Sequence, residues 1–178
     1  MLVLTKEQIM ESFSMREAID ACKESLKLYS EKKASVPLRT NINIAKQEGQ
    51  SLYMPAYVEG NEEALGVKIV SVYPKNIEKN IPSVPATMVT LDAETGMVSA
   101  ILDGTYLTQL RTGAVQGAAT ELLSRKDSKV GALIGTGGQA ECQLWAMLTA
   151  RELEEVRIFD IDFDRATGFA KEMEAKYR

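Results

Sequence analysis

The sequence predicts an α/β fold in two parts, an N-terminal α+β region followed by a parallel βαβα unit. Before residue 124, two helical segments enclose a series of segments with strand-like alternation. After residue 128, two apolar segments each precede a helical one, an order that is typical of a parallel sheet. The polar stretch Ser124–Ser128 separates the two patterns. We therefore expect one domain at residues 1–124 and a second at residues 125–178.

The elements of the first region follow from capping and periodicity. Ser14 and Glu17 have the spacing of a capping box, and apolar residues follow at helical intervals, which predicts a helix over 15–32. Period-two alternation predicts strands over 36–44, 51–58 and 65–73, with Arg39 on the polar face of the first. A hairpin is expected from 86–92 and 97–102, and a second helix over 105–124. Gly113 and Gly117 make one face of that helix small, so another backbone or a ligand could approach closely.

The second region predicts strands over 129–135 and 155–161 and helices over 138–151 and 165–176. These elements suit a parallel sheet covered by its crossover helices.

Composition excludes several classes of function. The net charge of −4 disfavours a nucleic-acid surface, which needs clustered positive charge. No apolar run approaches the roughly 20 residues of a membrane span, and the N-terminus lacks the apolar core of a secretory signal. Cys22 and Cys142 stand far apart, which suits a reduced, cytoplasmic protein without a cysteine metal site. We expect neither nucleic acid nor membrane among the partners.

The chain contains no histidine. Proton transfer by these residues must therefore use Lys, Asp, Glu, Tyr or Cys. A Ser-His-Asp triad and a histidine zinc site cannot be built from them, and we expect no metal.

A glycine-rich loop carries the clearest functional signal. Gly135–Ala140 reads G-x-G-x-x-A, follows an apolar strand and opens a helix, which is the context of a Rossmann dinucleotide-binding loop. The glycines permit a tight turn and a close backbone approach to a pyrophosphate, which the helix N-terminus then favours. The alternative is a glycine turn in another α/β protein. The expected cofactor-binding residues here are Gly135, Gly137, Gly138, Gln139 and Ala140.

Asp160 closes the next strand, where an acid can accept hydrogen bonds from the adenosine ribose. Its carboxylate would repel a 2′-phosphate, so NAD(H) is favoured and NADP(H) remains possible, because Asp162 and Arg165 lie nearby. The residues after Gly135 suffice for only two strands and two helices. Since a complete Rossmann sheet has six strands, we expect an incomplete dinucleotide-binding domain.

Three basic residues are candidates for a substrate site. Lys68 interrupts an almost continuous apolar strand whose two faces are expected to be buried, so it is either desolvated or held charged by an anion; a solvated sheet edge is the alternative. Arg111 lies in a helix beside Leu107 and Val115, where a buried arginine would need a carboxylate, a phosphate or an internal salt bridge. Arg39 is a lone arginine on a strand, and a plain surface charge is its alternative.

Taken together, several stretches resemble the ornithine cyclodeaminase/mu-crystallin family. They are Val36–Arg39, Tyr53–Ala56, Gly66–Lys68, Tyr73–Asn76, Leu110–Ala114 and Gly135–Ala140. The resemblance implies a substrate and dimerisation domain followed by a Rossmann domain, a homodimer, and a chain nearly twice this length. It also implies that Arg39 and Arg111 hold the substrate carboxylate, that Lys68 acts in the chemistry and binds substrate, and that Arg111, Thr112, Asp160 and Asp162 join the cofactor site.

Family members differ in activity, and one position bears on the choice. Ornithine cyclodeaminases resemble one another in a Glu-Leu-Met-Pro stretch whose glutamate meets the distal amine, whereas this sequence has Leu52-Tyr53-Met54-Pro55. Because Leu52 cannot bind an ammonium group, ornithine is disfavoured. The leading hypothesis is an NAD(P)H-dependent enzyme that reduces a small 2-imino or cyclic imino acid, such as pyrroline-2-carboxylate, or acts as an alanine dehydrogenase. A cyclodeaminating ammonia-lyase and a non-catalytic ligand-binding or dimerisation fragment are the alternatives.

Overall fold

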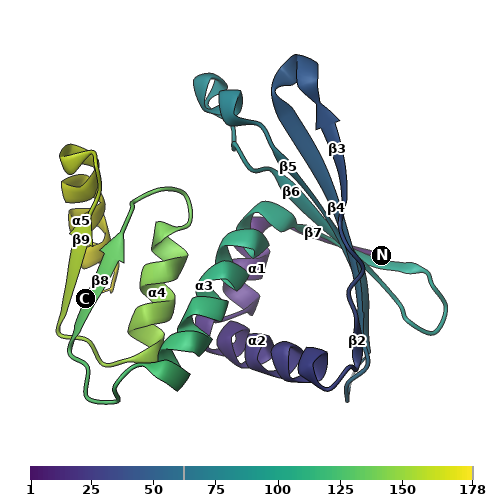
Figure 1. The fold of residues 1–178 in the computed structure, drawn as a ribbon, viewed down its shortest axis with the longest axis horizontal. Helices are drawn as coiled ribbons and strands as arrows, with labels where there is room; N and C mark the ends of the chain where they lie inside the picture. The colour runs from purple at the N-terminus through teal and green to yellow at the C-terminus, as the bar shows by residue number, and fades with distance from the viewer. Residues whose placement is uncertain (62, 178) are drawn as a thin grey trace. The chain divides into compact units, whose positions relative to one another are not determined.

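The computed structural model describes residues 1–61 and 63–177; Glu62 and Arg178, which fall inside the predicted domains, lie outside the described residues (Figure 1). The chain forms two compact units, one of Met1–Phe13 with Glu24–Thr108, the other of Ser14–Lys23 with the residues from Gln109 onward. Two helices, α2 (Met15–Ser30) and α3 (Gly104–Leu123), contribute residues to both units. The units do not divide at Ser124, because most of α3 packs within the second unit. A functional boundary at Ser124 stays a prediction.

The first unit is built on a seven-stranded sheet with the order β1-β7-β6-β5-β4-β2, and β3 also pairs with β4. All neighbouring strands are antiparallel except the pair β1–β7. The strands are β1 (Leu2–Leu4), β2 (Ala34–Ser35), β3 (Thr40–Ile44), β4 (Gly49–Val58), β5 (Ala64–Val72), β6 (Ala86–Leu91) and β7 (Val98–Asp103). Two short 3-10 helices, η1 (Ala45–Gln47) and η2 (Pro74–Lys79), join neighbouring strands.

One face of this sheet forms the core of the first unit. Leu52 and Val70 are cross-strand partners and are both buried. Ile69, the residue before Val70 in β5, points to the other face and is exposed. The prediction that both faces of this strand are buried is therefore wrong. An antiparallel sheet can leave one face open, even where the sequence is continuously apolar.

The segment before β3 also departs from expectation. The sequence predicts a strand over 36–44, but the strand begins at Thr40, and Leu38 is 96% exposed. Pro37 has no N–H to donate to a ladder, which explains why regular pairing starts after it. Arg39 consequently lies just outside β3 and is exposed.

The N-terminal elements were not predicted. β1 pairs with β7, and Thr5 caps α1 (Lys6–Ser12) through a reciprocal pair of hydrogen bonds with Gln8. The three residues of β1 are too few for an alternation signal, and Thr5 with Gln8 is the cue that reveals the helix start. The capping box at α2 is confirmed, since the Ser14 N–H donates to Glu17 Oε2 at 2.8 Å and the Glu17 N–H donates to Ser14 Oγ at 3.3 Å.

The second unit contains the predicted parallel pair. β8 (Val130–Ile134) and β9 (Glu155–Phe159) pair in parallel, and α4 (Ala140–Ala150) and α5 (Phe163–Tyr177) follow them (Figure 1). Both helices pack on one face of the pair, and the core they form contains Leu133, Leu144, Met147 and Met173. The α/β class and the βαβα order are thus confirmed.

Small residues of α3 bring α4 close to it. A Cβ on Gly113 would lie 2.4 Å from the Cys142 carbonyl oxygen, and one on Gly117 would lie 3.2 Å from the Ala146 Cβ. The small face of this helix is therefore occupied by another backbone, one of the two possibilities that the sequence left open. α4, which begins at the glycine-rich loop, is held firmly by this packing.

Polar contacts also join the carboxyl ends of α3 and α4. Arg151 Nη2 donates to the carbonyl oxygens of Thr120, Glu121 and Ser124, all within 3.1 Å. Thr120 and Glu121 lie in the last turn of α3 and Ser124 follows it, so the guanidinium caps the carboxyl end of that helix. Glu121 in turn pairs with Arg16 and Lys23 of α2.

Candidate functional site

The glycine-rich loop has a geometry that can receive a phosphate. β8 ends at Ile134, and Gly135 has φ +95°, a left-handed conformation that glycine adopts without strain. The Gly135 N–H donates to the Phe159 carbonyl oxygen at 2.7 Å, which ties the loop to the end of β9. A Cβ placed on Gly137 would meet no atom within 4 Å, so a ligand has open space on that side of the backbone.

The start of α4 adds donors beside this space. No side-chain hydrogen bond caps the helix at Gln139, although the Ala140 N–H donates to the Gly137 carbonyl oxygen at 2.9 Å. A helix start without a side-chain cap is a place where an anion can bind. The residues present therefore fit the pyrophosphate of a dinucleotide. The features that fit are the positive φ of Gly135, the open side of Gly137 and the helix start without a side-chain cap.

Asp160 directly follows β9, and its carboxylate is surrounded by donors. Oδ2 accepts from the Thr136 N–H and the Thr136 hydroxyl, both at 2.7 Å. Oδ1 accepts from the Asp162 N–H at 3.0 Å and from Arg165 Nη2 at 2.7 Å. The side chain of Asp160 is only 3% exposed. Hydrogen bonds from the Asp162 N–H and from Thr136, with Arg165 adding to them, hold the pKa of this carboxyl far below its ordinary value.

Thr136 is the partner that the sequence interpretation missed. It occupies the variable position between the first two glycines of the loop, where no property of the motif marks it. Its hydroxyl also accepts from Arg165 Nε at 3.2 Å. A threonine in the loop together with an acid after the next strand is the signal from which this contact could be anticipated.

Asp162 and Arg165 take part in this contact as donors, but their side chains extend to the surface. Asp162 is exposed, and its Oδ1 accepts from the Arg165 N–H at 3.0 Å, which caps the start of α5. The side chain of Arg165 is 52% exposed.

Lys68 lies in the middle of β5, in the first unit. It pairs with Met54 on β4 and Met88 on β6, and it is half-buried on the same face as buried Val70. Two methionines, one on each neighbouring strand, therefore flank the lysine stem. The structure therefore places Lys68 inside the sheet, between two partner strands.

Arg39 lies at the level of Lys68 along the sheet. Thr40, the first residue of β3, pairs with Tyr53, and the next residue of β4, Met54, pairs with Lys68. Arg39 immediately precedes Thr40, so its backbone is near the level at which Lys68 crosses the sheet. These two candidates share the first unit.

Arg111 and Thr112 belong to the second unit, with the glycine-rich loop. Arg111 is exposed, so the interpretation of it as a buried arginine beside Leu107 and Val115 is wrong. Val115 is itself 40% exposed, and the apolar side chains of α3 do not enclose the guanidinium. Thr112 lies one residue further along α3 and is half-buried. The candidates thus form two groups, each described within its own unit.

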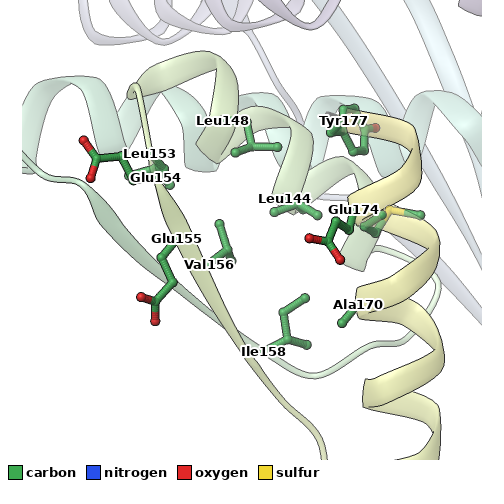
Figure 2. A pocket seen from close by; sticks show the side chains of 11 residues that line it. Leu144, Leu148, Leu153, Glu154, Glu155, Val156, Ile158, Ala170, Glu174 and Tyr177 are labelled. Carbon is green, nitrogen blue, oxygen red and sulfur yellow. The ribbon is translucent and has the colours of Figure 1, made fainter.

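The second unit also has a hollow of about 420 Å³, which is not part of the loop (Figure 2). Its lining comes from α4, β9, the segment between them and α5, and the labelled side chains include Leu153, Ile158 and Tyr177 (Figure 2). Asp160 and the glycine-rich loop are at the carboxyl ends of the strands, whereas Glu155 begins β9. Ligands of parallel α/β sheets bind beyond the carboxyl ends of the strands, so the hollow, which lies between β9 and its covering helices, is not the expected site.

Two searches of the described residues bear on other kinds of site. Within residues 1–61 and 63–177, no helix combines the length and the apolar character needed to cross a bilayer. The same residues hold no group of three or more acidic or cysteine side chains placed to share a metal ion.

Comparison with known proteins places this site in a family. A model of the ornithine cyclodeaminase/mu-crystallin family matches residues 1–177. The chain belongs to the ornithine cyclodeaminase/mu-crystallin family. A relative, the Δ1-pyrroline-2-carboxylate reductase of Bacillus cereus, is 33% identical over 177 residues, which cover 99% of this chain and 54% of that protein. The chain therefore spans about half the length of the curated relatives it matches.

Solved structures of other family members resemble the chain closely. The Δ1-pyrroline-2-carboxylate reductase of Thermococcus litoralis, in complex with NADH and L-proline, is 44% identical with a TM-score of 0.93. That match covers 99% of this chain and 54% of the other. An archaeal alanine dehydrogenase dimer with bound NAD is 37% identical with a TM-score of 0.89, over 99% of this chain and 53% of the other. The family and the fold class predicted from the sequence are confirmed.

Proposed function

We propose that this chain carries the dinucleotide loop and the first substrate residues of an NAD(H)-dependent oxidoreductase that reduces a small 2-imino or cyclic imino acid. Δ1-Pyrroline-2-carboxylate is the favoured substrate, and the reductive amination of pyruvate to alanine is the nearest variant of the same chemistry. The observation that carries the proposal is the match to the Thermococcus litoralis reductase, solved with NADH and L-proline, at 44% identity over 99% of this chain. L-Proline is the product that reduction of this cyclic imine would give.

The loop residues hold the cofactor in this proposal. The backbone around Gly137 and the start of α4 bind the pyrophosphate, because the outer side of Gly137 is open and a helix N-terminus carries partial positive charge. Gln139, Ala140 and the residues after β9 line the adjacent parts of the site, with Arg111 and Thr112 contributing from α3. NADH, when bound, supplies a hydride to the substrate carbon. We favour NAD(H) over NADP(H) because exposed Asp162 would repel a 2′-phosphate.

The basic residues bind and protonate the substrate. Arg39 of the first unit and Arg111 of the second are our candidates for binding the substrate carboxylate, because a planar guanidinium binds a carboxylate through paired hydrogen bonds. Lys68 donates a hydrogen bond or a proton at the imine nitrogen. Because the chain has no histidine, the choice of proton donor among its residues is narrowed, and a lysine ammonium can fill that role. The cross-strand partners of Lys68 on β4 and β6 are both methionines, which are apolar neighbours for its stem.

A steady-state assay of the protein tests this function against its two alternatives. With NADH and Δ1-pyrroline-2-carboxylate, we expect loss of NADH absorbance in step with formation of proline. Proline and ammonia formed from ornithine without net change in NADH would instead establish a cyclodeaminating lyase. Binding of dinucleotide with no turnover of either substrate would support the non-catalytic reading.

The residue at position 52 argues against the lyase. Leu52 is 8% exposed and pairs with Val70, so the site that would meet a distal amine is apolar. Burying an unpaired ammonium there would be costly. We therefore expect kcat/KM for ornithine to be far below that for the cyclic imine.

Partners and location follow the same proposal. A homodimer is favoured, since the related alanine dehydrogenase was solved as a dimer. A reduced, cytoplasmic setting is favoured by the two free cysteines, Cys22 and Cys142. Light scattering of the purified protein tests the first of these.

A further inference from the structure

We infer that Asp160 is a positioning residue that shapes the glycine-rich loop, and that Asp162 and Arg165 distinguish NADH from NADPH. This inference rests on the proposed function, because it concerns the same dinucleotide site. The usual reading of an acid after the second strand is a direct contact with the ribose 2′-hydroxyl. The contacts of Asp160 point elsewhere.

Both oxygens of Asp160 are already used within the chain. Two donors of Thr136 meet Oδ2, and the Asp162 N–H and Arg165 Nη2 meet Oδ1. With a side chain 3% exposed, the carboxylate offers little surface to a ligand. A ribose hydroxyl would have to displace one of these charge-assisted hydrogen bonds.

The contact with Thr136 places Asp160 in control of the loop. Thr136 stands between Gly135, whose φ is +95°, and Gly137, whose outer side is open. Holding the Thr136 N–H inward fixes the peptide planes on either side, and so aims the neighbouring N–H groups. Asp160 therefore sets the shape that receives the pyrophosphate, which NADH and NADPH share.

Asp162 and Arg165 are the charged side chains that a ribose can reach beside this contact. Both follow the carboxyl end of β9, next to the loop at the carboxyl end of β8, and both are exposed. Asp162 Oδ1 caps α5, while Oδ2 makes no hydrogen bond among residues 1–61 and 63–177. Arg165 reaches the loop through Thr136 and remains half exposed. The Asp162 carboxylate favours the ribose 2′-hydroxyl of NADH, and the Arg165 guanidinium can bind the 2′-phosphate of NADPH. The relative strength of these two interactions decides which cofactor binds more tightly.

The test compares Asp160→Asn with Asp162→Asn by calorimetric titration of the chain with NADH and with NADPH. In Asp160→Asn, an NH₂ group replaces one of the two carboxylate oxygens, each of which accepts two hydrogen bonds. An NH₂ group cannot accept them, so two donors lose their partner and the loop is disrupted. We expect both affinities to fall together, by roughly tenfold or more, with their ratio unchanged. Asp162→Asn keeps the oxygen that caps α5, and should raise the affinity for NADPH relative to NADH.

Amide hydrogen exchange supplies a readout that does not depend on the cofactor. Asp160→Asn should speed exchange of the Thr136 and Asp162 amides in the unliganded chain. The matched control is Asp164→Asn, which removes a carboxylate from the exposed first turn of α5. The side chain of Asp164 makes none of the hydrogen bonds to Asp160. This control should leave the exchange rates and both affinities unchanged.

Two outcomes separate this inference from the proposed function. An Asp160→Asn chain that changes the NADH to NADPH ratio, while the Thr136 amide stays protected, would show that Asp160 reads the ribose and would overturn the inference alone. An unsubstituted chain that binds neither dinucleotide would overturn the proposed function, and the inference with it.

Discussion

The chemistry proposed for this protein depends on Lys68 more than on any other side chain. Lys68 is half-buried between Met54 and Met88, and the chain offers no histidine as another acid. If it acts at the reacting nitrogen, Lys68→Met should lower kcat by about 10²–10⁴-fold, the range for a lost general acid. Methionine keeps the apolar stem, so the free energy of unfolding should change little. Steady-state kinetics and thermal melts measure the two effects.

Two further variants separate a proton donor from a plain positive charge. Lys68→Arg should not restore activity, since guanidinium is a poor proton donor and its planar fork differs from a point ammonium. Arg39→Ala should raise KM at least as much as it lowers kcat, because a carboxylate clamp acts in both ground and transition states. Near-normal kcat in Lys68→Met would make Lys68 a structural lysine.

Gly135 gives a second prediction for a single residue. At φ +95° an alanine is strained although its Cβ meets no atom within 4 Å, so Gly135→Ala should cost about 1–2 kcal/mol of folding free energy. Affinity for NADH should fall as the turn shifts. Gly168→Ala is the matched control: Gly168 lies inside α5 with open space around it, so alanine should stabilise by about 0.5–1 kcal/mol. Chemical denaturation decides the prediction, and equal effects of the two substitutions would refute it.

Among the elements, the junction of α2 with α3 makes stability sensitive to acid. Burial acts to raise the pKa of Glu121, but hydrogen bonds and charges of Lys23 and Arg16 outweigh it and hold that pKa below its ordinary value of 4.5. A carboxyl with a lowered folded pKa contributes stability that is present above its unfolded pKa and is lost as pH falls through the folded pKa. The free energy of unfolding should therefore drop below about pH 4.5.

Substitution isolates the part of this acid sensitivity that comes from Glu121. Glu121→Gln should be less stable at pH 7 by about 1 kcal/mol or more, since two cations lose their charged acceptor. It should also show a shallower fall in stability between pH 5 and pH 3. Denaturation curves across this range measure both, and an unchanged pH slope would show that the ion pairs contribute nothing.

How far the sequence predicts the elements depends on the length and regularity of each pattern. Long periodic segments such as α2 and α3 and the hairpin of β6 with β7 lie within a few residues of their expected bounds. The pair β1 and α1 gives too short a pattern, although Thr5 and Gln8 form a capping box that could have been noticed. The strand expected over 36–44 loses its first residues because Pro37 cannot join a ladder.

The sequence predicted which residues are candidates for the site better than it predicted the exposure and the hydrogen-bond partners of those residues. The G-x-G-x-x-A motif located the loop because glycine has a conformational role that spacing alone reveals. Exposure of Arg111 could not be inferred, since apolar neighbours on a helix need not enclose a side chain. The four hydrogen bonds to Asp160 do not follow from the motif, because the pairing of β8 with β9 brings Thr136 to the carboxylate; the loop threonine itself was the available cue.

At the scale of the whole molecule, two units divide the proposed work. The first presents Lys68 and Arg39 on a mainly antiparallel sheet, and the second holds the loop on a parallel pair with two helices. Family membership covers both units, because the family model matches residues 1–177. If the proposed function is right, a nicotinamide dinucleotide binds to the second unit at the glycine-rich loop.

The direct measurement is a titration of the isotope-labelled chain with NADH, followed by the backbone amide resonances. The account predicts progressive, saturable shifts at Gly137, Gly138, Gln139 and Ala140, with small changes around the hollow lined by Leu153 and Tyr177. Shifts confined to that hollow, or no saturable shift in the loop, would contradict it.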